Sequence, residues 1–366
     1  MKVSIFLPSL AGGGAERMAL NLIHGLLEKE VNVDLVVASL SGELANNLPD
    51  QLNLVNFATE HVSRALFPLI RYLRKEKPDI LFSGIDHANI VAILAALFSF
   101  TKVQRVISVH QVGTSFRRIH TGFKENLVQS LSKFIFPMAH KIVAVSLGVK
   151  ADLVQNMNIP RDKVVVIGNP ILSENVFSWL ADTEHEKELE PRIVAIGRLS
   201  KEKDFETLIH AFYLVNQSLP SQLVIYGEGQ ERNALELLSG ELGIQNRVKM
   251  PGFQRDIFSV LPLARVCVLS SLTEGFGNVI VEALACGVPV VSTDCPVGPR
   301  EILMDGEYGK LVPVGNPTLM ANAIVETLSG TVDKRKLIKR ANDFTIEHIT
   351  DLYLDLFINL IATGKV

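Results

Sequence analysis

Residues 270–282 read SSLTEGFGNVIVE, and the rest of the chain is organised around this stretch. The preceding residues 265–269 form a short apolar run typical of a buried strand, and a helical pattern begins after Gly277. A glycine-containing loop therefore joins a strand to the start of a helix. Such a start presents unpaired amide N–H groups and the positive end of the helix dipole, which together attract anions.

Two carboxylates lie on either side of this helix start. Glu274 is in the loop, and Glu282 follows eight residues later in the helix. Gly275 and Gly277 let the loop backbone approach a bound group closely. An anion held between carboxylates that can bind hydroxyl groups has the chemistry of a sugar nucleotide.

The composition indicates a packed globular protein. The chain has 366 residues, enough for two domains of about 150 residues each. Its three cysteines, Cys267, Cys286 and Cys295, lack metal-ligand spacing and favour a reduced compartment. No signal peptide pattern follows Met1, and the longest apolar run is far shorter than the ~20 residues that span a bilayer. We expect a cytoplasmic protein, with a peripheral place on the inner face of the cytoplasmic membrane left open.

Apolar runs and amphipathic stretches alternate along the chain, which predicts an α/β fold with two mostly parallel sheets. In the first half, strands are expected at 3–7, 32–38, 52–57, 79–82, 103–109, 141–145 and 163–167, with helices at 15–30, 68–76, 88–98, 122–137 and 147–157. The pattern restarts with strands at 192–196, 222–226, 248–250, 264–269 and 288–292 and helices at 205–217, 230–242, 257–263 and 278–286.

A charged stretch without apolar periodicity lies between the two halves and predicts a linker. We expect Rossmann-like domains at 1–170 and 191–345 that face each other across a cleft, a linker at 171–190, and a C-terminal helix at about 346–366 that packs back on the first domain. Ligands of such sheets bind beyond the carboxyl ends of the strands. Residues 1–170 carry 18 Lys and Arg against 13 Asp and Glu, which favours an anionic partner there, with ordinary charge scatter as the alternative.

The glycine-rich turn at 11–17 joins the first expected strand to a helix. A nicotinamide-cofactor site would give a role to Asp34, which follows about 20 residues further on. Such a site requires a third glycine at position 17, where this chain has Arg17. A loop near a phosphate or an acceptor at Gly14, or a tight turn with no ligand, remain as alternatives.

Three further polar residues follow expected strands. Arg198 can bind two phosphate oxygens and Lys203 can supply a point charge, unless both are ordinary surface cations. His110 contacts either a sugar and its leaving phosphate, or only neighbouring protein groups. Turns at 226–229 and 251–253 could let a base or ribose lie against the backbone.

The chain lacks the sequence motifs of several other enzyme classes. It has no P-loop, no hydrolase nucleophile elbow, no Asp-x-Asp pair for a divalent metal and no His/Cys cluster for zinc. A diphosphate would therefore be held by Arg, Lys and helix amides, with no metal and no other cofactor.

An apolar stripe at helical spacing runs through Phe116, Ile119, Phe123, Leu127, Leu131 and Phe134, with Arg117, Arg118, Lys124 and Lys133 off the stripe. One interpretation is a helix that packs on its own sheet. The other is a basic and apolar surface that contacts anionic lipid or a lipid-linked diphosphate.

Taken together, these stretches resemble the retaining glycosyltransferases of the GT-B fold, in the large fourth family. The most specific match is the Glu274-x7-Glu282 pair running on into ALACGVPVVSTD at 283–294. The segments GGAER at 13–17, GRL at 197–199 with Lys203, and GEG at 227–229 match in order and spacing.

The resemblance implies roles for individual residues. Glu274 contacts sugar hydroxyls, Glu282 contacts ribose hydroxyls, and Arg198 and Lys203 neutralise the diphosphate. The implied catalytic set is His110, Arg198, Lys203 and Glu274; the implied donor-binding set is Gly14, Gly227, Glu228, Phe253, Gly275, Phe276, Gly277, Asn278, Val279 and Glu282. Transfer would retain the anomeric configuration without a metal, and the leaving phosphate oxygen would take the acceptor proton.

The resemblance therefore predicts transfer of a hexose or N-acetylhexosamine from a nucleoside-diphosphate sugar, UDP-linked, to a glycan or a polyprenyl-diphosphate-linked acceptor. Residues 293–303 are similar to bacterial members that build such glycans. Arg117, Arg118 and Lys124 are the expected acceptor or membrane surface, and no nucleic acid is expected as a partner. A non-hydrolysing UDP-sugar epimerase and a sugar-nucleotide-binding regulator are the alternatives.

Overall fold

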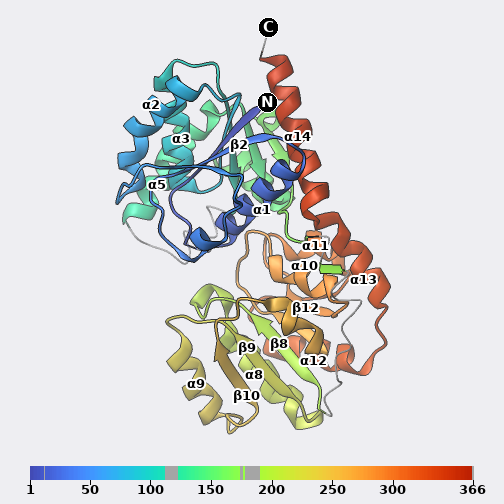
Figure 1. Ribbon diagram of the computed structural model, residues 1–366. Coiled ribbons are helices and arrows are strands. Elements are labelled where there is room, and N and C mark those ends of the chain that lie inside the picture. The colour runs from blue at the N-terminus through green and yellow to red at the C-terminus, as the bar shows by residue number, and fades with distance from the viewer. Residues whose placement is uncertain (12, 112–122, 174–175, 178–189, 365–366) are drawn as a thin grey trace. The chain divides into compact units, whose positions relative to one another are not determined.

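The computed structural model describes residues 1–11, 13–111, 123–173, 176–177 and 190–364 (Figure 1), apart from the side chains of 47 and 123–126. The chain divides into two compact units. The N-terminal unit comprises Met1–Ile171 and Ile346–Val366, and the C-terminal unit comprises Leu172–Thr345.

The N-terminal unit is built on a parallel sheet whose strand order is β3-β2-β1-β4-β5-β6-β7. Its strands are β1 (Lys2–Leu7), β2 (Asn32–Val37), β3 (Asn53–Asn56), β4 (Ile80–Ser83), β5 (Gln104–Val109), β6 (Lys141–Ala144) and β7 (Val164–Val166). Its helices are α1 (Gly14–Glu28), α2 (Leu66–Glu76), α3 (Asp86–Ser99), α5 (Phe123–Ile135), α6 (Leu147–Asn156) and α14 (Ile346–Thr363).

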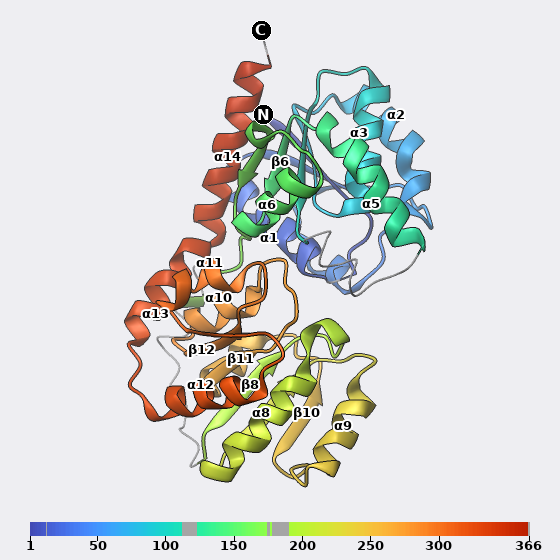
Figure 2. The same ribbon diagram turned by 180° about the vertical axis from the view of Figure 1, so that it is seen from behind.

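Both faces of this sheet are covered by helices, as Figures 1 and 2 show. Because side chains alternate along a strand, Ile5 of β1 packs in the cluster with α1 and α14, whereas Phe6 packs with α2 and α3. The last helix of the chain fills its place with aromatic side chains: the ring of Tyr353 lies 5.6 Å from that of Phe82 on β4. α14 thus completes the core of the N-terminal unit.

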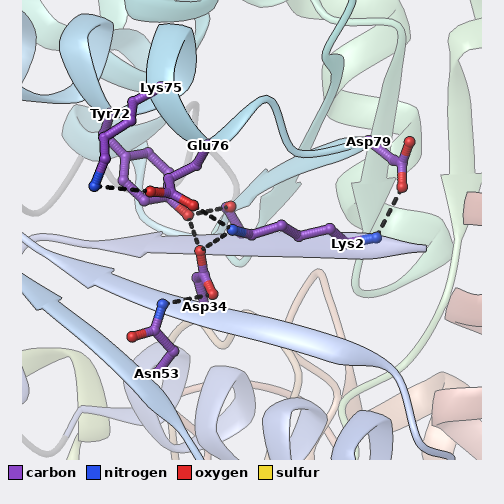
Figure 3. Close-up of polar contacts among 8 residues, drawn as sticks. Lys2, Asp34, Asn53, Tyr72, Lys75, Glu76 and Asp79 are labelled. Carbon is purple, nitrogen blue, oxygen red and sulfur yellow. Dashed lines mark hydrogen bonds and ion pairs between the residues drawn. The ribbon is translucent and has the colours of Figure 1, made fainter.

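A buried polar network lies toward the amino ends of β1 and β2 (Figure 3). The carboxylate of Asp34 accepts a hydrogen bond from Tyr72 and one from Asn53 Nδ2 at 2.8 Å, and it lies 2.9 Å from Lys2 Nζ. Lys2 Nζ also reaches Glu76 at 2.8 Å. Burial, together with the bond to Asp34, raises the pKa of Tyr72. Asp34 therefore bonds to other protein groups and lies away from the carboxyl edge of the sheet, where ligands are expected. This position does not suit a residue of a nicotinamide site.

The C-terminal unit has a second parallel sheet, in the order β10-β9-β8-β11-β12-β13. Its strands are β8 (Arg192–Ile196), β9 (Gln222–Tyr226), β10 (Val248–Gly252), β11 (Val266–Leu269), β12 (Val290–Thr293) and β13 (Lys310–Val312). Its helices are α8 (Phe205–Ser218), α9 (Arg232–Glu241), α10 (Asn278–Ala285), α11 (Pro299–Ile302), α12 (Pro317–Ser329) and α13 (Lys334–Ala341). The core joins α8 and α12 to the sheet.

The predicted α/β class with two Rossmann-like sheets is confirmed, and two local predictions are wrong. Residues 257–263, expected as one helix, form two 3-10 turns, Ile257–Ser259 and Leu261–Leu263, because Pro262 lacks the N–H that a continuing helix needs. The edge strand β13 is absent from the predicted set, since three residues are too few to show a strand period.

Across the described residues, no helix is both long enough and apolar enough to cross a membrane.

Candidate active site

The loops that follow β8, β9 and β10 are joined by backbone hydrogen bonds. Gly197 N–H donates to Tyr226 O at 2.9 Å, and Gly227 N–H donates to Gly252 O at 2.8 Å. A Cβ atom at Gly227, where φ is +147°, would lie 1.9 Å from Gly197 O. Only glycine therefore fits at this close approach of two strand ends.

A cluster of hydrogen bonds connects Lys203 to the loop after β11. Lys203 Nζ lies 2.5 Å from Glu274 Oε1, and Ser271 Oγ donates to the same oxygen at 2.6 Å. The backbone is fixed as well: Ser270 Oγ donates to Lys203 O, and Thr293 Oγ1 donates to Ser271 O, both at 2.7 Å. The position of the Glu274 carboxylate is thus set by Lys203 and Ser271, and its loop is tied to Lys203 and to Thr293 at the end of β12.

This cluster changes the interpretation of the two charged residues. The sequence treats Lys203 as a phosphate ligand and Glu274 as a sugar ligand, whereas the structure pairs them with each other. An ammonium group has three N–H donors, so the pairing leaves two for an anion. Ser271 is absent from the predicted set, because a buried serine beside a glutamate carries no distinctive pattern.

Two glycines shape the start of α10. Gly277 is the N-cap residue of the helix at φ +99°, and as a glycine it has no side chain to cap the first turn. A Cβ atom at Gly298 would lie 2.0 Å from Phe276 O. The Phe276 ring is buried against Phe344 at 5.6 Å. This anchoring leaves the predicted segment 275–279 at the helix start, next to Glu274.

Glu282 lies partly buried on α10 near two thiols. Burial, with the charge of Glu282 adding to it, raises the pKa of Cys267 to about 12 and also raises the pKa of Cys286. Burial and the charge of Glu274 raise the pKa of Cys295 to about 12. The three thiols are therefore neutral at physiological pH and are not nucleophiles.

Three other predicted donor-site residues lie on the loops after β8, β9 and β10. Arg198 is exposed, and the Phe253 ring is 55% exposed. The Glu228 carboxylate is engaged by Arg232, whose Nη2 and Nε lie 2.6 and 2.9 Å from its two oxygens. The backbone of Glu228, which accepts from Leu199 N–H, is the part that lies at the loop junction.

His110 and Gly14 belong to the N-terminal unit. His110 follows β5, and its Nε2 lies 2.8 Å from Ser108 Oγ. Burial lowers the pKa of His110 to about 4, so the ring is neutral at physiological pH. A Cβ atom at Gly84, after β4, would lie 3.5 Å from the same nitrogen. Gly14 is the first residue of α1.

A pocket of about 620 Å³ opens at the carboxyl edge of the N-terminal sheet. It is lined by Pro8, Ser9, Ser39, Ser41, Thr59, Glu60, His61, Val62, Ser63, His87, Leu127 and Val128. These described lining residues include hydroxyls and imidazoles but neither Lys nor Arg, which suits a neutral polyol better than a phosphate. The sequence did not predict the pocket, because its residues come from separate loops without a shared motif.

Some predicted site residues lie outside the residues that the structure describes. Arg117 and Arg118 lie outside the described residues, as does the side chain of Lys124. Within the described part of the chain, no three His, Cys, Asp or Glu side chains form a group that could hold a metal ion. Independence from metal remains a prediction.

Two Rossmann-like units with site residues beyond their strand ends define the class of GT-B glycosyltransferases. Solved structures share the fold: a glycosyltransferase from Rickettsia africae has a TM-score of 0.82 and 19% identity over 98% of both chains. HepE from Anabaena, in complex with UDP, has a TM-score of 0.78 and 19% identity over 98% of this chain and 100% of its own.

Family models match both halves of the chain. Residues 12–174 match Glycosyltransferase Family 4, and residues 190–330 match Glycosyl transferases group 1. These segments take up most of the chain, which therefore belongs to the family-4, group-1 glycosyltransferases. The predicted family is confirmed, and the predicted enzyme class is confirmed at the level of a glycosyltransferase.

Curated relatives extend over nearly the whole chain. The N-acetylgalactosamine-N,N'-diacetylbacillosaminyl-diphospho-undecaprenol 4-alpha-N-acetylgalactosaminyltransferase of Campylobacter jejuni is 29% identical over 352 residues, 92% of each chain. The lipopolysaccharide core biosynthesis glycosyltransferase LpsE of Rhizobium meliloti is 29% identical over 360 residues, covering 94% of this chain and 95% of LpsE.

Proposed function

We propose that the protein transfers a hexose or N-acetylhexosamine from a UDP-sugar to a glycan carried on a polyprenyl diphosphate, with retention and without a metal. The names of the Campylobacter and Rhizobium relatives support a lipid-linked or polysaccharide acceptor, and the UDP bound to HepE supports the nucleotide. The observation that carries the proposal is the Lys203–Glu274–Ser271 cluster beside the start of α10.

The donor is held by the C-terminal unit in this proposal. Arg198 and Lys203 neutralise the diphosphate, and the amides of 275–279 add the positive end of the α10 dipole. Glu274, oriented by Lys203 and Ser271, accepts hydrogen bonds from the sugar hydroxyls, and Glu282 accepts hydrogen bonds from the ribose hydroxyls. Stabilising the leaving diphosphate is the main catalytic contribution of these groups.

Proton transfer follows from the same arrangement. The leaving phosphate oxygen takes the proton of the acceptor hydroxyl on the face where the new bond forms, which preserves the anomeric configuration. His110 is neutral at physiological pH and contacts the transferred sugar by a hydrogen bond, without serving as an imidazolium acid. No side chain needs to become a nucleophile.

The acceptor is assigned to the N-terminal unit. Its pocket offers hydroxyl and imidazole groups to a sugar, and Gly14 begins a helix at the same edge of the sheet. Residues 1–170 are the acceptor domain, and residues 191–345 are the donor domain. A peripheral place on the inner face of the cytoplasmic membrane brings the enzyme to a lipid-linked acceptor.

The test supplies UDP-sugars with and without a membrane lipid extract and measures released UDP. Release that depends on the extract is expected for transfer, and loss of that release in Glu274→Ala ties it to the site. Isomerised sugar nucleotide without an acceptor would mean an epimerase. Tight UDP-sugar binding with no turnover on any extract would mean a regulator. NMR of the product anomer and assay in EDTA test retention and metal independence.

A further inference from the structure

Asp86 is the first residue of α3 and stands at the carboxyl edge of the N-terminal sheet. It follows β4, which lies between β1 and β5 in the strand order. Most residues that line the pocket follow β1, β2 or β3, and His87, directly after Asp86, is the lining residue that follows β4. His110 follows β5, on the other side of β4. Asp86 therefore lies between the pocket assigned to the acceptor and the residue proposed to contact the transferred sugar.

The register of the two strands keeps Asp86 close to His110. Ser83 of β4 pairs with Ile107 of β5, and Asp86 and His110 each follow three residues later. A Cβ atom at Gly84 would lie 3.5 Å from His110 Nε2, so the loop that carries Asp86 packs directly on the imidazole. The two residues thus occupy matching positions beyond neighbouring strand ends.

The Asp86 carboxylate has no partner in the part of the chain that the structure describes. None of the described residues donates a hydrogen bond to it, and none of their cations pairs with it. Burial raises the pKa of Asp86 to about 6, although the start of a helix favours a charged carboxylate. The residue is partly exposed and can be reached by a ligand. The group is therefore mostly ionised at pH 7 and lacks the donors that a buried carboxylate usually has.

Glu60, a second carboxylate at this edge, is in a different state. It lines the pocket, but its side chain is 79% exposed, and its Oε2 accepts a hydrogen bond from Arg64 Nη1 at 2.9 Å. Water and Arg64 therefore compete with any ligand of Glu60. Of these two carboxylates, Asp86 is the one that a bound sugar can use without breaking an ion pair.

We propose that Asp86 accepts a hydrogen bond from the acceptor hydroxyl next to the attacking one, and so selects which hydroxyl receives the sugar. This step rests on the proposed function. The attacking hydroxyl has a single proton, which the leaving phosphate oxygen takes in that mechanism, so this hydroxyl cannot also donate to a carboxylate. A neighbouring hydroxyl keeps its proton and can donate throughout the reaction. Such a bond, made to a charged group without a competing partner, fixes the orientation of the acceptor ring.

The experiment compares the wild type with Asp86→Asn, using p-nitrophenyl glycosides of hexoses and N-acetylhexosamines as soluble acceptors. Asp86→Asn should lower kcat/KM for the acceptor about 10–100-fold, the range for a hydrogen bond to a charged group. The KM for the UDP-sugar should stay unchanged. Asp79→Asn is the matched control, because Asp79 precedes the same strand at its opposite end and accepts from Lys2 N–H at 2.8 Å. This control should transfer as the wild type does, and circular dichroism checks that both variants fold.

Acceptors that lack one hydroxyl identify the group that Asp86 holds. Removal of that hydroxyl should lower the wild-type kcat/KM by the same factor as Asp86→Asn does, and the variant should be indifferent to the removal. NMR of the product should show one linkage from the wild type and a mixture of linkages from the variant. A merely structural role of Asp86 would produce neither result.

Equal kcat/KM of Asp86→Asn and the wild type would overturn the proposal, as would a loss in the variant that multiplies with the loss from every deoxy acceptor. Saturation-transfer NMR of the same glycosides, with UDP present, covers the case in which the wild type transfers to none of them. Glycoside binding by the wild type that Asp86→Asn weakens would then sink only the proposed function and keep Asp86 as a sugar ligand. Equal binding by both proteins, or no binding to the wild type, would overturn this inference too.

Discussion

The ammonium of Lys203 and the carboxylate of Glu274 form an ion pair at 2.5 Å, although the two residues are 71 positions apart in the chain. Both side chains are largely buried, and the hydroxyl of Ser271 shares the same carboxylate oxygen. The proposed phosphate ligand and the proposed sugar ligand therefore act as one unit.

Lys203→Met and Glu274→Gln should each lower kcat by about 10²–10³-fold, the loss typical of removing one electrostatic stabiliser. Because each residue orients the other, the double variant should lose little more than either single variant. The wild type, the two single variants and the double variant are compared by steady-state UDP release with a saturating acceptor. Losses that simply multiply would show that the two groups act separately.

Ser271→Ala should lower kcat about tenfold, because the hydroxyl that orients the Glu274 carboxylate is removed. A tenfold loss corresponds to about 1.4 kcal/mol of transition-state stabilisation. The affinity for UDP should stay unchanged, because the hydroxyl contacts the carboxylate and not the nucleotide in our proposal. Calorimetric UDP titration beside the kinetics separates the two effects. Ser270→Ala, which removes a bond to the Lys203 backbone, is the control; an equal loss of kcat there would point to general loosening of the loop.

Glu282→Ala should weaken UDP binding by about 1–3 kcal/mol, the cost of leaving a buried hydrogen-bonding group unpaired. Isothermal calorimetry with UDP measures the change. Glu326→Ala removes an exposed carboxylate that pairs with Lys310 in the same unit, and it should have no effect. Unchanged UDP affinity in the Glu282 variant would refute the ribose assignment.

His110 should not titrate in the activity profile between pH 6 and 8, because its pKa in the folded protein is about 4. Its folded pKa lies below the ordinary value of about 6.5, so the unfolded chain binds the extra proton first. The stability that neutral His110 contributes is complete above pH 6.5 and is lost as the pH falls toward 4.

Urea denaturation at pH 7 and pH 4.5 tests this with His110→Asn. The variant should lose less stability on acidification than the wild type. His140, whose pKa is also lowered to about 4 by burial and by Arg105 and Lys163, is present in both proteins and cancels in the comparison. An identical pH dependence of the two proteins would contradict the assigned pKa.

Asp34→Asn should lower the free energy of unfolding by about 1–3 kcal/mol, because Lys2 and Tyr72 lose a buried charged partner. Urea denaturation of the full chain measures the loss. Glu76→Gln removes the more exposed partner of Lys2 and should lower the free energy of unfolding less than Asp34→Asn does, because solvent screens an exposed ion pair. A larger loss of stability in the Glu76 variant than in the Asp34 variant would show that the exposed ion pair contributes most of the stabilisation.

Most of the fold could be predicted because parallel strands buried on both sides form short, unbroken apolar runs separated by amphipathic helices. The edge strand β13 escaped prediction, since Lys310–Val312 is too short for a pattern. The helix expected at 257–263 failed at Pro262, where a local restriction outweighs apolar spacing.

The site could be predicted in its parts but not in its pairings. Glycine positions and the spacing of Glu274 and Glu282 are visible in the chain, whereas the contact of Lys203 with Glu274 depends on how β8 and β11 lie side by side. The orientation of α5 was also undetermined, because Leu127 and Phe134 each adjoin an apolar residue, Val128 and Ile135, on the other face. Spacing alone cannot choose which face is buried.

Because α14 is the last helix of the chain and belongs to the N-terminal unit, it limits when that unit can complete its folding. The chain leaves the N-terminal unit at Ile171 and returns to it only at Ile346. A ribosome that has released all seven strands of the first described sheet has yet to make Tyr353 and Phe357, the side chains that cover Phe82. The half that is synthesised first is therefore completed last, after the contiguous second half has been synthesised. A chain that ends before α14 would leave exposed the apolar face of the N-terminal unit that α14 covers. Chaperones and proteases recognise such exposed faces.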